Sequence, residues 1–133
     1  MADINLVKTD LKKENEGVWT DFAAGIQLKI ARARNPKYSE LFRDLIEPHR
    51  KDIRNEKLEM EDFADILLQI RARTILLDWR NIEENGVSVP YSPEKAMVYF
   101  RDLELKDFYN FVIAVSENAD QYKKDLIKDA EKN

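Results

Sequence analysis

With 133 residues, 44% of them hydrophobic, the chain has the length and apolar content of one domain with one core. Three glycines and four prolines favour long regular elements over a loop-rich sandwich, and the lack of cysteine excludes a disulfide framework and thiolate metal sites. A net charge of −4, from 22 basic and 26 acidic residues, gives no field suited to nucleic acid as the main partner. We therefore expect a single domain over residues 1–133.

The first residues, 1–15, are polar and charged, and they predict a loosely held, flexible arm. They contain no apolar run of the kind that a signal peptide needs. The longest apolar stretches, such as Ile75 to Leu77, are too short to span a bilayer. These features predict a soluble, cytosolic protein without a membrane partner.

Residues 17–33 have the pattern of a β-hairpin. Ile26, Leu28 and Ile30 alternate with polar or small residues after the Ala23-Ala24-Gly25 turn, and Trp19 and Phe22 precede that turn. A helix over residues 18–33 is the alternative, because alanine, leucine, lysine and arginine also suit a helix. The hairpin is the preferred interpretation.

Residues 35–126 are predicted to form a helical core. Asn35 and Pro36 have the types expected at a helix cap and first turn, and this helix should end near Pro48. The longest periodic pattern covers residues 60–84, which predicts a central helix that ends at Asn85-Gly86.

Two more helices follow in the predicted core. Ser92-Pro93 begins a short helix, and a last long helix begins near Glu104 or Leu105 and extends to Leu126. Residues 127–133 are predicted to fray. The predicted fold class is therefore mainly α, with about four to five packed helices and a small N-terminal β-hairpin as a minor β component.

The sequence offers no group of residues suited to catalysis, to a cofactor or to a metal. His49 is the only histidine, it lies between Pro48 and Arg50, and its spacing suggests no nucleophile or orienting acid. Phosphate-binding glycine motifs and the Gly-x-Ser-x-Gly turn are absent. We therefore predict a protein that is not an enzyme and that needs no cofactor.

A basic run is the main candidate for binding another protein. Lys29, Arg32, Arg34 and Lys37 have no acid among them, and Arg32 and Arg34 are expected on one face of the second hairpin strand. The run either prevents strand pairing with other chains or docks an acidic partner. Trp79 is expected to cover the edge of the core. The full set of candidate partner-binding residues is Lys29, Arg32, Arg34, Lys37, Trp79 and Tyr91.

Several short segments together resemble a known family. They are Gly17-Val18-Trp19, Lys29 to Arg32, Asn35 to Tyr38, Asp78 to Ile82, Glu83 to Gly86, Val89 to Ala96 and the closing Lys132-Asn133. In combination and in order, they resemble the tail assembly chaperones of long-tailed bacteriophages and prophages. The resemblance extends over about residues 15–133.

The resemblance implies a non-enzymatic function. It implies a chaperone that binds the long helical tape-measure protein, keeps its apolar stretches from aggregating and assists assembly of the major tail (tube) protein. Such a protein acts in the cytoplasm of the bacterial host and is absent from the mature virion. The alternative is a structural tail or head-tail connector component that stays in the virion. The sequence leaves open whether the chain forms a homo-oligomer.

Overall fold

The computed structural model describes residues 1–125, so the predicted frayed tail over residues 127–133 lies outside the described residues. The elements in chain order are η1 (Ile4–Val7), α1 (Leu11–Glu16), β1 (Val18–Asp21), β2 (Gln27–Ile30), α2 (Pro36–Ile46), η2 (Glu47–His49), α3 (Arg50–Arg54), α4 (Met60–Thr74), β3 (Leu76–Arg80), β4 (Glu83–Glu84), β5 (Val87–Ser88), α5 (Pro93–Arg101), η3 (Leu103–Leu105), α6 (Lys106–Glu117) and η4 (Ala119–Tyr122), where η marks a 3₁₀ helix.

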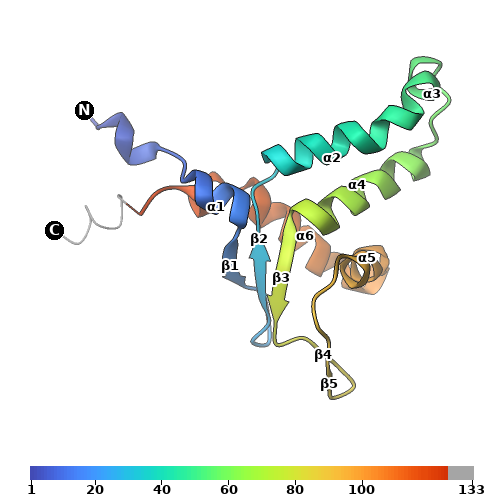
Figure 1. Cartoon of the computed structure of the whole chain (residues 1–133). Coiled ribbons are helices and arrows are strands. Elements are labelled where there is room, and N and C mark those ends of the chain that lie inside the picture. Colours follow the sequence, from blue (N-terminus) through green and yellow to red (C-terminus); the bar gives the residue numbers. More distant parts are fainter. Residues whose placement is uncertain (126–133) are drawn as a thin grey trace.

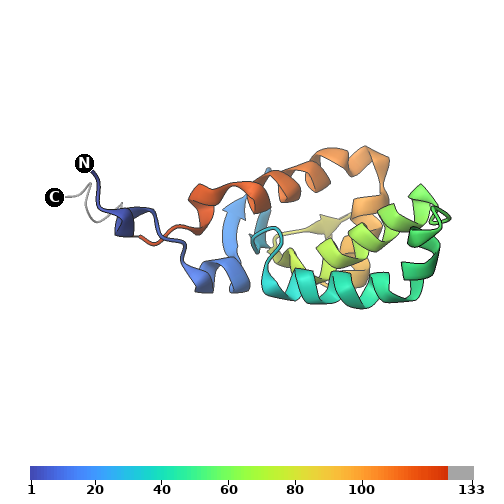
Figure 2. The same cartoon turned by 90° about the horizontal axis from the view of Figure 1, so that it is seen from above.

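The molecule consists of a small sheet with helices around it and one long projection. The strands β1, β2 and β3 form an antiparallel sheet in that order, and β4 and β5 form a separate two-stranded sheet. Helices α2 and α4 run side by side away from the sheet, with α3 at the far end (Figures 1 and 2). We call residues 36–74 the arm.

The base of the arm is attached to the sheet by hydrogen bonds. The Ala31 N–H, just after β2, donates to the carbonyl of Ile75, just before β3, at 2.8 Å. The side-chain amide of Asn35 donates to the carbonyl of Thr74 at 3.0 Å. The two ends of the arm are therefore held together where the chain leaves and re-enters the sheet.

The predicted fold class, mainly α with one small hairpin, is wrong: the fold is mixed α+β with two antiparallel sheets. The predicted helix over 60–84 ends at Thr74, and Leu76–Arg80 pairs with β2 as β3. Lys29 pairs with Asp78 and Ile30 pairs with Leu76, so Leu77 has no partner on β2 and forms a β-bulge. The buried positions Leu76 and Trp79 are therefore three residues apart, a spacing that in sequence indicates a helix.

The Asn85-Gly86 pair was predicted to end the central helix, but it forms the turn of the β4–β5 hairpin. Glu84 pairs with Val87 directly across this turn. Asn85 and Gly86 have φ of 52° and 80°, which is the left-handed region that two-residue hairpin turns require. β3 and β4 replace the C-terminal part of the predicted helix and β5 follows it, so the predicted helical core over residues 35–126 is interrupted by strands.

The predicted hairpin over residues 17–33 is confirmed, and the alternative helix is not formed. β1 and β2 are antiparallel, with Val18 opposite Ile30 and Asp21 opposite Gln27. The Phe22 N–H donates to the Ile26 carbonyl at 2.9 Å and closes the turn. Leu28 and Ile30 are buried, as their alternation predicts.

Residues 1–15 were expected to be a loosely held N-terminal segment, but residues 9–15 are attached to the rest of the domain. The Asp10 carboxylate accepts hydrogen bonds from the N–H groups of Lys12 and Lys13 and caps α1. The Asp10 N–H donates to the Tyr122 carbonyl at 2.7 Å, and Thr9 pairs with Lys123. The backbone of this segment therefore forms hydrogen bonds with the C-terminal part of the described chain.

The predicted starts of two helices are confirmed, whereas the end of the last helix is not. Asn35 caps α2 and Ser92 caps α5, each through its side-chain oxygen. α6 ends at Glu117 instead of continuing to Leu126. The Asn118 side chain accepts a hydrogen bond from the Asp120 N–H and starts η4, which offers the backbone an alternative to the helix.

The main core lies where the three-stranded sheet meets α4, α5 and α6. Its buried residues are Leu28, Ile30, Ala72, Ile75, Leu76, Trp79, Ile82, Ala96, Tyr99, Phe100, Phe108 and Val112. Tyr122 is also fully buried, and its hydroxyl donates to the Ile30 carbonyl at 3.1 Å. Aromatic side chains thus connect the sheet with the helices that cover it.

Candidate protein-binding surface

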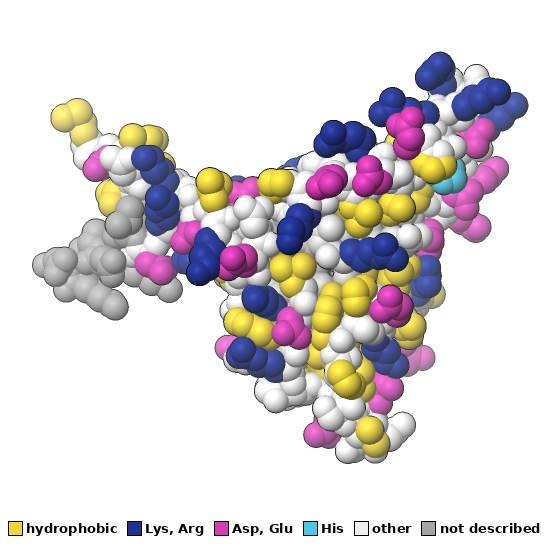
Figure 3. Space-filling model, in the orientation of Figure 1, with side chains coloured by type: hydrophobic (Ala, Val, Ile, Leu, Met, Phe, Trp, Pro, Cys, Tyr) yellow, Lys and Arg dark blue, Asp and Glu magenta, His cyan; other side chains and the backbone are white. Residues whose placement is uncertain are grey.

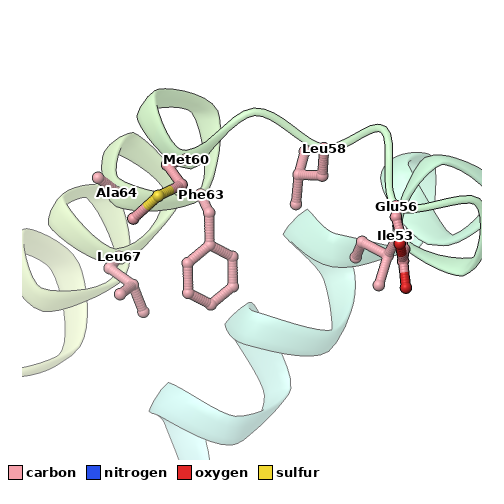
Figure 4. A pocket seen from close by; sticks show the side chains of 7 residues that line it. All are labelled: Ile53, Glu56, Leu58, Met60, Phe63, Ala64 and Leu67. Atoms are coloured by element: carbon pink, nitrogen blue, oxygen red, sulfur yellow. The ribbon is translucent and has the colours of Figure 1, made fainter.

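The far end of the arm carries an open apolar hollow, which we call the arm cup. Its volume is about 480 Å³, and it is lined by Ile53, Glu56, Leu58, Met60, Phe63, Ala64 and Leu67. Figure 4 shows Phe63 and Leu67 on α4, with Leu58 and Ile53 across from them on the connecting segment and α3. Met60 is 87% exposed and Ile53 is 41% exposed, so apolar surface remains in contact with water.

The arm cup lies where the apolar seam between α2 and α4 ends. Within the seam, the Phe42 and Phe63 rings meet edge to face with centroids 6.5 Å apart, and Tyr38 stacks on Phe42. At the N-terminal end of α4, before Phe63, the helix faces only the short α3 and the connection that follows it, so fewer residues pack against it. Exposed hydrophobic side chains are visible between basic and acidic side chains along the arm (Figure 3). Contiguous apolar surface rimmed by charge is typical of a protein interaction site.

The chemistry of the arm cup is that of a binding surface. Among residues 1–125, Glu56 is the only ionisable side chain in its lining, so these residues supply the cup with no pair of groups for proton transfer or nucleophilic attack. It offers apolar contact to the side chains of a partner, in the way that a hydrophobic groove accepts the apolar face of a helix.

The structure places the predicted basic residues on different elements: Lys29 is on β2, Lys37 is on α2, and Arg32 and Arg34 lie between them. β2 ends at Ile30, so Arg32 and Arg34 do not share a strand face as expected. Arg32 lies 3.8 Å from the Glu14 carboxylate and donates to the Thr9 hydroxyl at 3.1 Å. Lys29 lies on β2, whereas Arg34, with φ of 57°, and Lys37 are exposed beyond it. The Arg32 side chain therefore helps to hold α1 and Thr9 against the rest of the domain.

Trp79 and Tyr91, the other two candidates, belong to the core. Trp79 is 5% exposed, and its indole N–H donates to the Val89 carbonyl at 2.8 Å. The Tyr91 hydroxyl lies 2.6 Å from the Leu76 carbonyl and 3.0 Å from the Ala72 carbonyl. The two rings meet edge to face at 5.0 Å. This pair links the segment after β5 to the end of α4 and to β3.

The environment of Tyr91 predicts a loss of stability in alkaline solution. Burial, followed by the nearby charges of Asp78 and Glu94, raises the pKa of Tyr91 to about 12 from 10.0. The stabilisation is fully present below pH 10 and is lost as the pH rises toward 12, because the unfolded chain ionises first. We expect the Tyr91 contribution to the free energy of unfolding to fall by about 1 kcal/mol at pH 11.

Urea unfolding at pH 8 and pH 11, for the wild type and for Tyr91→Phe, measures this effect. The variant should lose less stability than the wild type between the two pH values. An equal loss in both proteins would exclude Tyr91 as a source of the pH dependence.

The sequence-based reasoning missed the residues of the arm cup. Between the predicted helix end near Pro48 and the helix predicted over 60–84, the chain is mostly charged, and Ile53, Leu58 and Met60 stand out as apolar residues at short intervals. Their spacing matches no single helix, because the chain turns back between α3 and α4. The available signal was apolar residues inside an otherwise charged segment.

Within residues 1–125, no group of His, Asp and Glu side chains is arranged to hold a metal ion. Over the same residues, no helix combines the length and the apolar character that crossing a membrane requires.

Comparison with known proteins identifies the class of protein. The model of a family described as YdaY prophage protein matches residues 33–133, from the base of the arm onward, so this is a phage or prophage protein. Because the match covers more than half of the chain, the protein belongs to the YdaY prophage protein family. No curated protein and no solved structure shows a significant match.

Proposed function

We propose that this prophage protein is a non-enzymatic tail assembly chaperone that binds apolar segments of the tape-measure protein through the arm cup. The observation that carries the proposal is the exposed apolar surface around Met60 and Ile53 at the end of the arm. Membership of a prophage family and the resemblance of residues 15–133 to tail assembly chaperones support the phage setting. The chaperone acts in the host cytoplasm and assists assembly of the tail tube.

The geometry suits a client that is long and repetitive. A cup of about 480 Å³ accepts a few apolar side chains and therefore gives weak binding at each contact. Many copies along one extended helix would protect it along its length, while each copy remains easy to displace when the tube assembles. The arm places the cup away from the sheet (Figure 1), so a helix can approach it without contacting the sheet.

Co-expression with the tape-measure protein encoded by the same prophage tests the proposal. The wild type should form a complex with the tape-measure protein and keep it soluble. The double variant Ile53→Gln/Met60→Gln should weaken binding by about tenfold, which corresponds to about 1.4 kcal/mol of lost apolar contact, and should lower the yield of soluble tape-measure protein.

The matched control is Val7→Gln/Leu11→Gln, which replaces two exposed apolar residues in the N-terminal segment, at the opposite end of the molecule from α3 (Figure 1). It should leave the yield unchanged. The proposal fails if the wild type neither binds nor solubilises the tape-measure protein, or if the control lowers the yield as much as the cup variant does. Abundant peptides of this chain in purified virions would instead support a structural tail or connector component.

A further inference from the structure

A second hollow lies at another place on the molecule, between the turn of the β1–β2 hairpin, the β4 segment and helices α5 and α6. Its volume is about 460 Å³. Apolar side chains from all of these elements form its floor, including Ile26, Ile82, Val98, Leu105 and Phe108. Val98 is 53% exposed, so part of the floor remains in contact with water. We call this hollow the acidic groove.

Carboxylates form the rim of the acidic groove. Among residues 1–125, five carboxylates line it, those of Glu83, Glu84, Asp102, Glu104 and Asp107, and no lysine or arginine does. They come from two sides, β4 on one, and the connection from α5 to α6 with the first turn of α6 on the other. A carboxylate rim around a low-dielectric floor concentrates negative potential in the groove.

The rim charges are only partly compensated within the molecule. Glu84 lies 2.9 Å from the Lys95 ammonium and accepts a hydrogen bond from the Tyr99 hydroxyl at 2.8 Å, and these contacts lower the pKa of Glu84. Within residues 1–125, no ion pair involves Glu83, Glu104 or Asp107. These three carboxylates therefore remain available to a cation from outside.

We propose that the acidic groove binds a basic amphipathic helix of a partner protein. The floor would accept an apolar stripe, and lysine or arginine side chains beside that stripe would reach the carboxylates on both sides. The aliphatic stems of such side chains would lie along the apolar edge of the groove while their charges meet the rim.

Other occupants fit the groove less well. A metal ion is disfavoured because the rim carboxylates belong to no His/Asp/Glu group within residues 1–125 arranged to hold one. A second copy of this chain offers a net charge of −4, and Arg32 of its basic run already contacts Glu14. The anionic rim also repels nucleic acid and acidic membranes.

This inference goes beyond the proposed function and does not depend on it. The acidic groove and the arm cup share no lining residue. Loss of tape-measure binding in a cup variant and loss of basic-peptide binding in a groove variant are therefore separate results.

A synthetic peptide tests the inference directly. It contains only leucine and lysine, is about 18 residues long and has helical amphipathic spacing. Fluorescence anisotropy of the labelled peptide, titrated with the full-length protein, gives the affinity. We expect saturable binding that weakens as salt is added. An isomer of the same composition without helical periodicity should bind at least about tenfold more weakly.

Paired variants locate the binding site. Glu83→Lys/Glu104→Lys should weaken peptide binding by at least about tenfold. The control, Glu40→Lys/Asp44→Lys, reverses two exposed acids on α2 and raises the net charge by the same amount, and it should have a much smaller effect. Val98→Gln should weaken binding, whereas Val7→Gln should not.

The inference is overturned by any of three results. The wild type does not bind the peptide, the isomer without helical periodicity binds equally well, or the α2 control weakens binding as much as the rim variant does. Circular dichroism and urea unfolding of each variant establish that it is folded. Since Val98→Gln leaves every charge in place, it tests the site even if the rim variant is unstable.

Discussion

Replacing Trp79 with alanine is expected to lower the free energy of unfolding by about 3–5 kcal/mol. Trp79 is 5% exposed and lies on β3, where its ring contacts Tyr91 at 5.0 Å and Tyr99 at 5.4 Å between centroids. Truncation leaves a cavity between the sheet and α5 and removes the hydrogen bond to the Val89 carbonyl. Both the cavity and the lost hydrogen bond lie within the main core.

Urea denaturation monitored by far-UV circular dichroism measures this effect. Trp79→Phe keeps an aromatic ring but leaves the Val89 carbonyl without its donor, so we expect a smaller loss of about 1–3 kcal/mol.

Trp19→Ala is the matched control. Trp19 is only partly buried on the outer strand β1, beneath the Arg80 guanidinium at 3.7 Å, and its loss should cost less than that of Trp79. A cost for Trp79→Ala no larger than that for Trp19→Ala would contradict the assignment of Trp79 to the core.

Asn35→Ala is expected to cost about 3 kcal/mol, because one side chain that is 1% exposed makes three hydrogen bonds. Its oxygen accepts from the Tyr38 N–H at 3.0 Å and caps α2. Its amide nitrogen donates to the carbonyls of Arg32, at 2.8 Å, and Thr74, at 3.0 Å. Alanine removes all three side-chain hydrogen bonds at the base of the arm and takes the Asn35 donor away from the buried Thr74 carbonyl.

Two further variants separate the cap from the carbonyl contacts. Asn35→Asp keeps the cap oxygen but places a carboxylate against two carbonyls, so it should also be strongly destabilised. Asn118→Ala removes a cap on η4 at an exposed position and should cost about 1 kcal/mol or less. Equal costs for Asn35→Ala and Asn118→Ala in urea unfolding would show that Asn35 acts as a simple cap.

The features that local sequence predicts well are those decided by local chemistry. Asn35 and Ser92 begin helices where their side chains cap them, and the alternation of Leu28 and Ile30 marks a strand. A cap or a two-residue period needs only near neighbours in sequence. These predictions therefore do not depend on how the remainder of the chain folds.

The features that sequence missed depend on distant partners. Leu76 and Trp79 have helical spacing, and only pairing with β2, more than forty residues earlier, makes them a strand with a bulge. Likewise, the sequence leaves Trp79 and Tyr91 as candidate partner contacts because it does not show the carbonyls that their N–H and O–H groups reach. The arm cup was missed because its residues converge only after α3 turns the chain back.

The attachment of the arm between adjacent strands has a consequence for how the chain folds. β2 and β3 are neighbours in the sheet, yet residues 31–75 separate them in sequence. Closing a flexible loop of that length costs about 3 kcal/mol of chain entropy, a cost that opposes early pairing of the two strands. Only residues 47–59 separate α2 from α4, and the two helices contact each other, so they can associate first and bring Ala31 near Ile75 before the sheet exists. On this view, the arm also guides the central strands to each other during folding.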